Sequence, residues 1–203
     1  SEKDVREQFR TIFKNYQHRI VVTCFSSNVA RLLSIFYAAR ENGRETALVG
    51  RSLWRMEAAA RDTGYIPADV RFLDEEEAGY VPRDKVVYIC TGSQGEFRAA
   101  LTKLATDSHP DLTLEAGDVV LYSSREIPGN EKAIAKVQNM LVKQGIRIVT
   151  DKDHPIHVSG HPCQDELTQM YQWVRPHIAL PVHGELRHQM ENARIAKLCQ
   201  VPH

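Results

Sequence analysis

Five short apolar runs, each separated from the next by a helix-length segment, constrain the fold of this chain more than any other feature. The clearest run, residues 85–90, is apolar at consecutive positions, as expected of a strand covered on both faces. The alternation of strand-like and helix-like segments predicts an α/β fold, a mostly parallel sheet with helices on both faces. The five runs are residues 19–25, 46–49, 85–90, 118–122 and 147–150.

Apolar residues at three- and four-residue spacing predict the helices between these runs. Ser26, Ser27 and Asn28 are all possible N-caps of the second helix, and Ser52 and Asn130 are expected to cap later ones, because such side chains can accept hydrogen bonds from the first turn. The acidic run at residues 74–77 is expected to be a solvated face within irregular structure. The expected helices before residue 150 are residues 4–16, 28–40, 52–61, 96–105 and 131–143.

Composition limits the classes of function. With 203 residues, 42% of them hydrophobic, the chain can bury one large core or two small ones. Lys and Arg total 26, as do Asp and Glu, so no net charge attracts nucleic acid and RNA would need local donors. The four scattered cysteines form no Cys-x-x-Cys pair, which favours buried free thiols in a reducing cytoplasm. No secretion signal or membrane span is expected.

The segment after residue 155 carries the strongest chemical signal. The segment at residues 151–155 is short and charged and ends in proline, which predicts a domain boundary there, with domains at residues 1–152 and 153–203. We expect a β-α-β-α order beyond this boundary. The strands would be residues 156–161 and 178–183, and the helices residues 164–174 and 185–200.

Three histidines gather at these two predicted strands. At a period of two, His157, Ser159 and His161 share one face of the first strand. His183 ends the second strand, next to a glycine, and ligands bind at such carboxyl ends in open α/β sheets. Residue pattern alone allows either structural, hydrogen-bonded histidines or a ligand site.

A glycine-rich turn follows the run at residues 85–90. Gly92 and Gly95 flank Ser93 and Gln94, and glycines let a backbone approach a phosphate closely. A tight turn from strand to helix requires glycine as well. The turn is therefore either a phosphate-binding loop or a plain connection.

Four motifs in this order resemble ribonuclease J and its relatives, bacterial metallo-β-lactamase-fold nucleases with a β-CASP insertion. In chain order they are Gly-Ser-Gln-Gly-Glu at 92–96, Pro-Gly-Asn-Glu at 128–131, His-Val-Ser-Gly-His at 157–161 and Pro-Val-His-Gly-Glu at 181–185. The resemblance runs from about Val5 to Cys199. It implies a β-CASP-like domain followed by a segment of the metallo-β-lactamase and RNA-specificity domain. The family's His-x-His-x-Asp-His metal cluster does not occur, so we expect a piece of a longer enzyme that is inactive without the rest.

The resemblance also implies the chemistry. Members of the ribonuclease J family are zinc-dependent nucleases that cut RNA internally and trim it from the 5′ end, using two zinc ions. His183 matches the terminal metal ligand, and the other ligands would lie outside this chain. His161 matches the catalytic histidine that contacts the scissile phosphate and protonates the leaving oxygen. The residues assigned to substrate binding are His157, Ser159, Gly160, Ser93, Gln94 and Asn28. The longer protein is expected to be a homo-oligomer with RNA as its partner.

Four positions depart from the family pattern, and two other functions stay open. Phe97 stands where a proline is common, Pro162-Cys163 replaces Ala-Ser, and Leu186 replaces an aromatic residue. None of them removes a ligand or a phosphate donor, so they bear on substrate preference. One alternative is a non-catalytic nucleotide- or RNA-binding α/β module, and another is a metallo-hydrolase that acts on a small molecule. A serine hydrolase is not favoured, because no Gly-x-Ser-x-Gly motif occurs.

Overall fold

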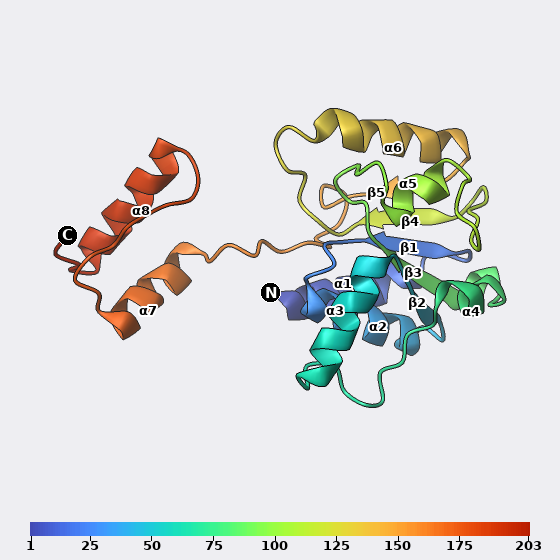
Figure 1. Ribbon diagram of the computed structural model, residues 1–203, viewed down its shortest axis with the longest axis horizontal. Coiled ribbons are helices and arrows are strands. Elements are labelled where there is room, and N and C mark those ends of the chain that lie inside the picture. Colours follow the sequence, from blue (N-terminus) through green and yellow to red (C-terminus); the bar gives the residue numbers. More distant parts are fainter. The chain divides into compact units, whose positions relative to one another are not determined.

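The computed structural model describes all 203 residues, which form two compact units (Figure 1). The first unit is Ser1–Val158 and the second is Ser159–His203. The predicted domain boundary after residue 152 lies a few residues before this division and stays a prediction.

The first unit is built on a five-stranded, all-parallel sheet in the order β2-β3-β1-β4-β5. Every residue of β1, β3 and β4 is buried, as the uninterrupted apolar runs predict. The prediction of an α/β fold with a parallel sheet is confirmed. The strands are β1 Ile20–Thr23, β2 Glu45–Val49, β3 Val86–Cys90, β4 Val119–Tyr122 and β5 Arg147–Val149.

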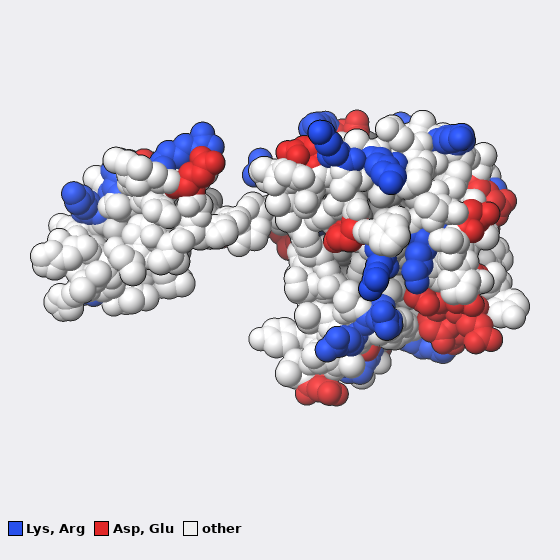
Figure 2. All heavy atoms as spheres, turned by 45° about the horizontal axis from the view of Figure 1, so that its top comes forward, with Lys and Arg blue, Asp and Glu red and all other residues white.

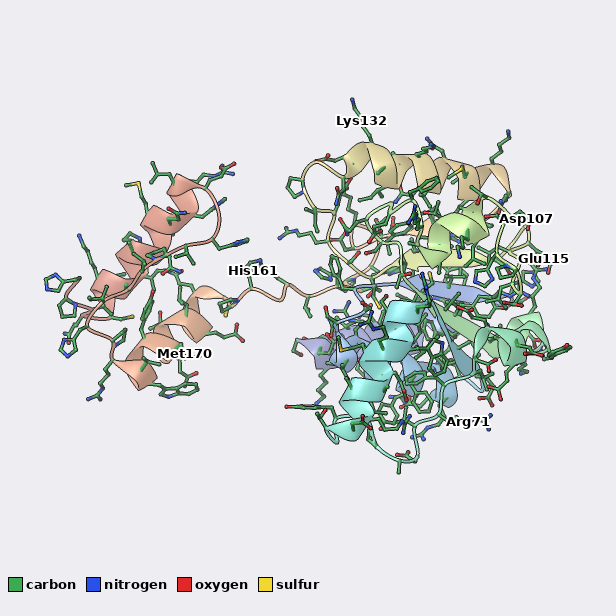
Figure 3. All side chains as sticks on the ribbon, in the orientation of Figure 1. Arg71, Asp107, Glu115, Lys132, His161 and Met170 are labelled. Atoms are coloured by element: carbon green, nitrogen blue, oxygen red, sulfur yellow. The ribbon has the colours of Figure 1, made fainter.

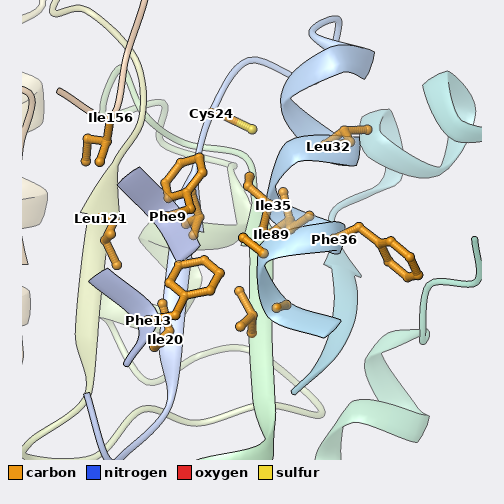
Figure 4. Packing of buried hydrophobic residues seen from close by; sticks show 14 of the residues in the cluster. Phe9, Phe13, Ile20, Cys24, Leu32, Ile35, Phe36, Ile89, Leu121 and Ile156 are labelled. Carbon is orange, nitrogen blue, oxygen red and sulfur yellow. The ribbon is translucent and has the colours of Figure 1, made fainter. Parts of the chain in front are cut away.

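Helices cover both faces of this sheet. On one face, Phe9 and Phe13 of α1 and Ile35 of α2 belong to the same buried cluster as Ile20 of β1 (Figure 4). On the other face, residues of α5 and α6 pack against β3 and β4 in a second cluster. The helices of this unit are α1 Glu2–Phe13, α2 Val29–Glu41, α3 Arg51–Asp62, α4 Glu75–Gly79, α5 Ala100–Ala105 and α6 Glu131–Lys143, with a 3₁₀ turn at Arg83–Lys85.

The helices α3 and α5 do not begin where predicted. The helix predicted to begin at Ser52 begins one residue earlier, after Gly50, and has no side-chain cap. The helix predicted from residue 96 begins only at Ala100, because the preceding loop packs against α6. At Gly95, φ is +75° and an added Cβ would lie 2.6 Å from the Ala133 carbonyl oxygen, so this close approach requires glycine.

The acidic run does more than face solvent. Asp74 caps α4 by accepting a hydrogen bond from the Glu77 N–H at 2.7 Å. Glu75 accepts a 2.9 Å hydrogen bond from the Gly50 N–H, which holds α4 to the turn after β2. Residues predicted to be irregular therefore include one short, capped helix.

The second unit contains two helices and no strand. They are α7 Gln164–Val174 and α8 Leu186–Leu198, close to the predicted bounds. The strands predicted at residues 156–161 and 178–183 are wrong, because neither run has a neighbouring strand with which to form a ladder. The β-α-β-α order is thus reduced to its two helices in this chain.

The second unit also leaves most of its apolar side chains in solvent. Met170 and Val174 of α7 are 52% and 62% exposed. Only Ile195, Ala196 and Val201 are buried hydrophobics in this unit, too few to cover the helix faces. None of the helices in the chain combines the length and apolar character needed to cross a membrane.

Candidate functional site

Two of the predicted site histidines lie side by side in the second unit. The rings of His161 and His183 are stacked, with centroids 5.6 Å apart and an interplanar angle of 20°. His161 precedes α7 (Figure 3), and His183 precedes α8. Both side chains are exposed, so both imidazoles can reach a ligand in solvent.

Short polar contacts hold the two turns that carry these histidines. The His161 N–H donates to Ser159 Oγ at 3.1 Å, which leaves the Ser159 hydroxyl proton free to donate. After His183, φ at Gly184 is +87°, and the Glu185 N–H donates to His188 Nδ1 at 3.2 Å. The sequence reasoning missed His188; its position three residues after the helix cap was the available signal.

His157 lies in the first unit and is half-buried. Its Nδ1 atom is buried and has no hydrogen-bond partner. Burial and the positive charge of Arg31 lower the pKa of His157, while the Asp151 carboxylate opposes this shift. The imidazole is therefore neutral at pH 7. Because this run forms no strand, the period of two no longer gives His157, Ser159 and His161 a shared face, and their part in substrate binding stays a prediction.

The other predicted substrate-binding residues lie at the carboxyl edge of the sheet. Asn28 caps α2, with its Oδ1 accepting a 3.0 Å hydrogen bond from the Arg31 N–H. Ser93 and Gln94 follow β3 and are both buried. Gln94 Nε2 donates to the Arg125 carbonyl at 3.0 Å, and its Oε1 accepts from the Ile127 N–H at 2.9 Å. Gln94 thus holds the loop after β4.

The donor set for a metal ion is incomplete within this chain. No three His, Cys, Asp or Glu side chains come together as a metal site. His183, exposed beside a second imidazole, fits the part of one ligand, and imidazole suits zinc. The thiols of Cys24 and Cys90 do not fit, since burial raises both pKa values, that of Cys24 to about 12.

Comparison with known proteins places both parts of the chain. Residues 17–141 match the family model described as ribonuclease J, β-CASP domain. Residues 145–197 match the model described as the Zn-dependent metallo-hydrolase RNA specificity domain. This description supports a metal cofactor for the family.

Curated relatives agree along the whole chain. Ribonuclease J of Sinorhizobium meliloti is 49% identical over 202 residues, which is 100% of this chain and 36% of the relative. The protein of that name in Mycolicibacterium smegmatis is 41% identical, with 100% and 36% covered. In Helicobacter pylori strain B128 the identity is 36%, with 100% and 29% covered. The chain spans about a third of the length of these relatives, and it belongs to the ribonuclease J family.

Proposed function

We propose that this chain is the β-CASP and RNA-specificity portion of a zinc-dependent ribonuclease that cuts RNA internally and also trims it from the 5′ end. The observation that carries the proposal is the stacked pair His161 and His183, at 5.6 Å between ring centroids. Two imidazoles at this spacing can act on one phosphodiester, one at the metal and one at the leaving oxygen. The two family matches support RNA as the substrate.

In this proposal the two histidines have different roles. His183 is the one metal ligand from this chain, and two bound zinc ions would supply an activated water and neutralise charge on the phosphate. His161 contacts the scissile phosphate and gives a proton to the leaving oxygen, a role that suits an imidazole because its pKa lies near neutrality. His188 holds the turn that aims His183.

A second phosphate, at the 5′ end of RNA, is assigned to residues 157–160. The Ser159 hydroxyl and the Gly160 N–H can donate hydrogen bonds to it, and the neutral His157 can donate one as well. Asn28, Ser93 and Gln94 are proposed to contact RNA farther along. Since Ser93 and Gln94 are buried, they would act through their backbone or through the loop that Gln94 holds.

The charge distribution supports RNA binding despite the zero net charge. Arg51, Arg98, Arg125 and Lys132 are exposed, lie on segments that leave the carboxyl ends of the strands, and form no ion pair. Figure 2 shows basic side chains over the middle of the first unit and acidic ones gathered toward the α4 end. Unpaired cations on one side supply the local attraction for phosphate that the net charge does not.

We extend the proposal to the cell compartment and the oligomeric state. The four cysteines are free, and two of them are buried, which suits a reducing cytoplasm. We propose a homo-oligomer for the longer protein by its family resemblance.

A chimaera tests the proposal. Residues 1–203 would replace the matching third of the Sinorhizobium meliloti ribonuclease J, which is 49% identical over this stretch. We expect RNA cleavage that a chelator abolishes, with RNA bearing a 5′-monophosphate trimmed faster than RNA bearing a triphosphate. The 203-residue chain alone should not cleave. A folded, metal-loaded chimaera that leaves RNA intact would contradict the proposal, as would chelator-sensitive cleavage by the short chain.

A further inference from the structure

A fully buried arginine joins four segments of the first unit. The Arg31 side chain is 0% exposed. It donates hydrogen bonds to the two oxygens of the Glu2 carboxylate, from Nε at 2.7 Å and from Nη2 at 3.0 Å. Its Nη1 donates to the Ser123 carbonyl at 2.8 Å and to Ser123 Oγ at 2.6 Å. The cluster of Arg31, Glu2 and Ser123 therefore links α1, α2 and the end of β4.

The fourth segment is the last part of the first unit. The Ile156 carbonyl accepts a hydrogen bond from Ser123 Oγ at 2.6 Å and a longer one from Arg31 Nη1 at 3.4 Å. Ile156 itself is fully buried. The cluster thus holds the peptide immediately before His157.

Arg31 cannot itself touch a substrate, because its guanidinium is buried and engaged by three partners. Burying a guanidinium is costly even when it is paired, and well-packed apolar residues are often at least as stable in such a place. The group must therefore act on its neighbours. The neighbour that can bind a phosphate is His157. Its buried Nδ1 lacks a hydrogen-bond partner, and the Arg31 charge opposes its protonation.

We propose that the cluster of Arg31, Glu2 and Ser123 is a positioning device that fixes the Ile156 carbonyl and thereby presents a neutral His157 to the 5′-phosphate of RNA. This rests on the proposed function, in which His157 binds that phosphate. Arg31 and Ser123 are positioning residues here, and His157 makes the contact.

The test compares two serine variants of the 203-residue chain. Ser123→Ala removes the hydroxyl that bonds the Ile156 carbonyl. Ser34→Ala is the matched control, since it also deletes a buried hydroxyl, one that has no hydrogen-bond partner. Hydrogen exchange at the Ile156 amide, measured by NMR, should become about fivefold faster in Ser123→Ala and stay unchanged in Ser34→Ala. Ser123→Thr, which keeps a hydroxyl, should restore slow exchange.

A second variant probes charge. Glu2→Gln leaves the Arg31 charge uncompensated, so the pKa of His157, read from its ring signals, should fall further. An Arg31 charge without electrostatic coupling to His157 would not move this pKa. Two results together would overturn the proposal. In the first, hydrogen exchange at the Ile156 amide is the same in Ser123→Ala as in Ser34→Ala. In the second, the pKa of His157 is the same in Glu2→Gln as in Ser34→Ala.

The chimaera separates this inference from the proposed function. In Ser123→Ala its preference for 5′-monophosphate over 5′-hydroxyl RNA should drop about fivefold, with internal cleavage and metal content unchanged. A parent chimaera without any such preference would refute 5′-phosphate sensing itself, while the NMR results still decide the positioning role. A parent that has the preference and a Ser123→Ala variant that keeps all of it would overturn the inference alone.

Discussion

Replacing Gln94 with alanine should destabilise the first unit, because its side chain holds the loop after β4. The change removes the 3.0 Å bond to the Arg125 carbonyl and the 2.9 Å bond from the Ile127 N–H, and a 3.3 Å contact with Asn130 Nδ2. Two backbone groups left without partners, at about 1 to 1.5 kcal/mol each, give a loss of about 2 to 3 kcal/mol in the free energy of unfolding.

Gln144 offers a matched control in the same unit. Its side chain makes a single hydrogen bond, to the Ala105 carbonyl at 2.8 Å, so Gln144→Ala should cost only about 1 kcal/mol. Urea unfolding followed by Trp54 fluorescence in a Trp173→Phe background reports the first unit alone, since each unit holds one tryptophan. A loss below about 0.5 kcal/mol for Gln94→Ala would refute the loop-holding role and favour direct RNA contact instead.

Three further perturbations test the fold around the site. Asp118 is fully buried and accepts a 2.9 Å bond from Arg19, so Asp118→Ala should cost about 3 to 5 kcal/mol in urea unfolding; a loss under 1 kcal/mol would contradict this. Gly95→Ala should lower stability by about 2 kcal/mol or more, since φ there is +75° and α6 blocks the new methyl group; an unchanged melting temperature would refute it. Burial lowers the pKa of His109, so as pH falls below about 6.5 the unfolded chain binds a proton first and stability drops. His109→Gln should reduce this drop between pH 7 and pH 5, and an equal drop would contradict the assignment.

The sheet could be predicted because its information is local. Runs such as residues 86–90 are apolar on both faces, and only a covered parallel strand accommodates that pattern. The runs at residues 156–161 and 178–183 also carry aliphatic residues at strand-like spacing, yet they form no strand. A strand also needs a neighbouring backbone, which a run of residues does not reveal.

The site could be predicted only in part, for a related reason. The motifs point to His161 and His183, and the structure brings their rings together. The role of Gln94 in the fold and the contacts of Arg31 depend on partners distant in sequence, 92 residues away for Ser123 and 125 for Ile156. No spacing rule covers such separations.

The central claim is that His183 binds metal while His161 acts on the phosphate, and metal analysis of two variants tests it most directly. In the chimaera, His183→Ala should lose bound zinc and RNA cleavage together. His161→Ala should keep its zinc and lose cleavage. Equal zinc content in the two variants, whether both retain it or both lose it, would contradict the claim.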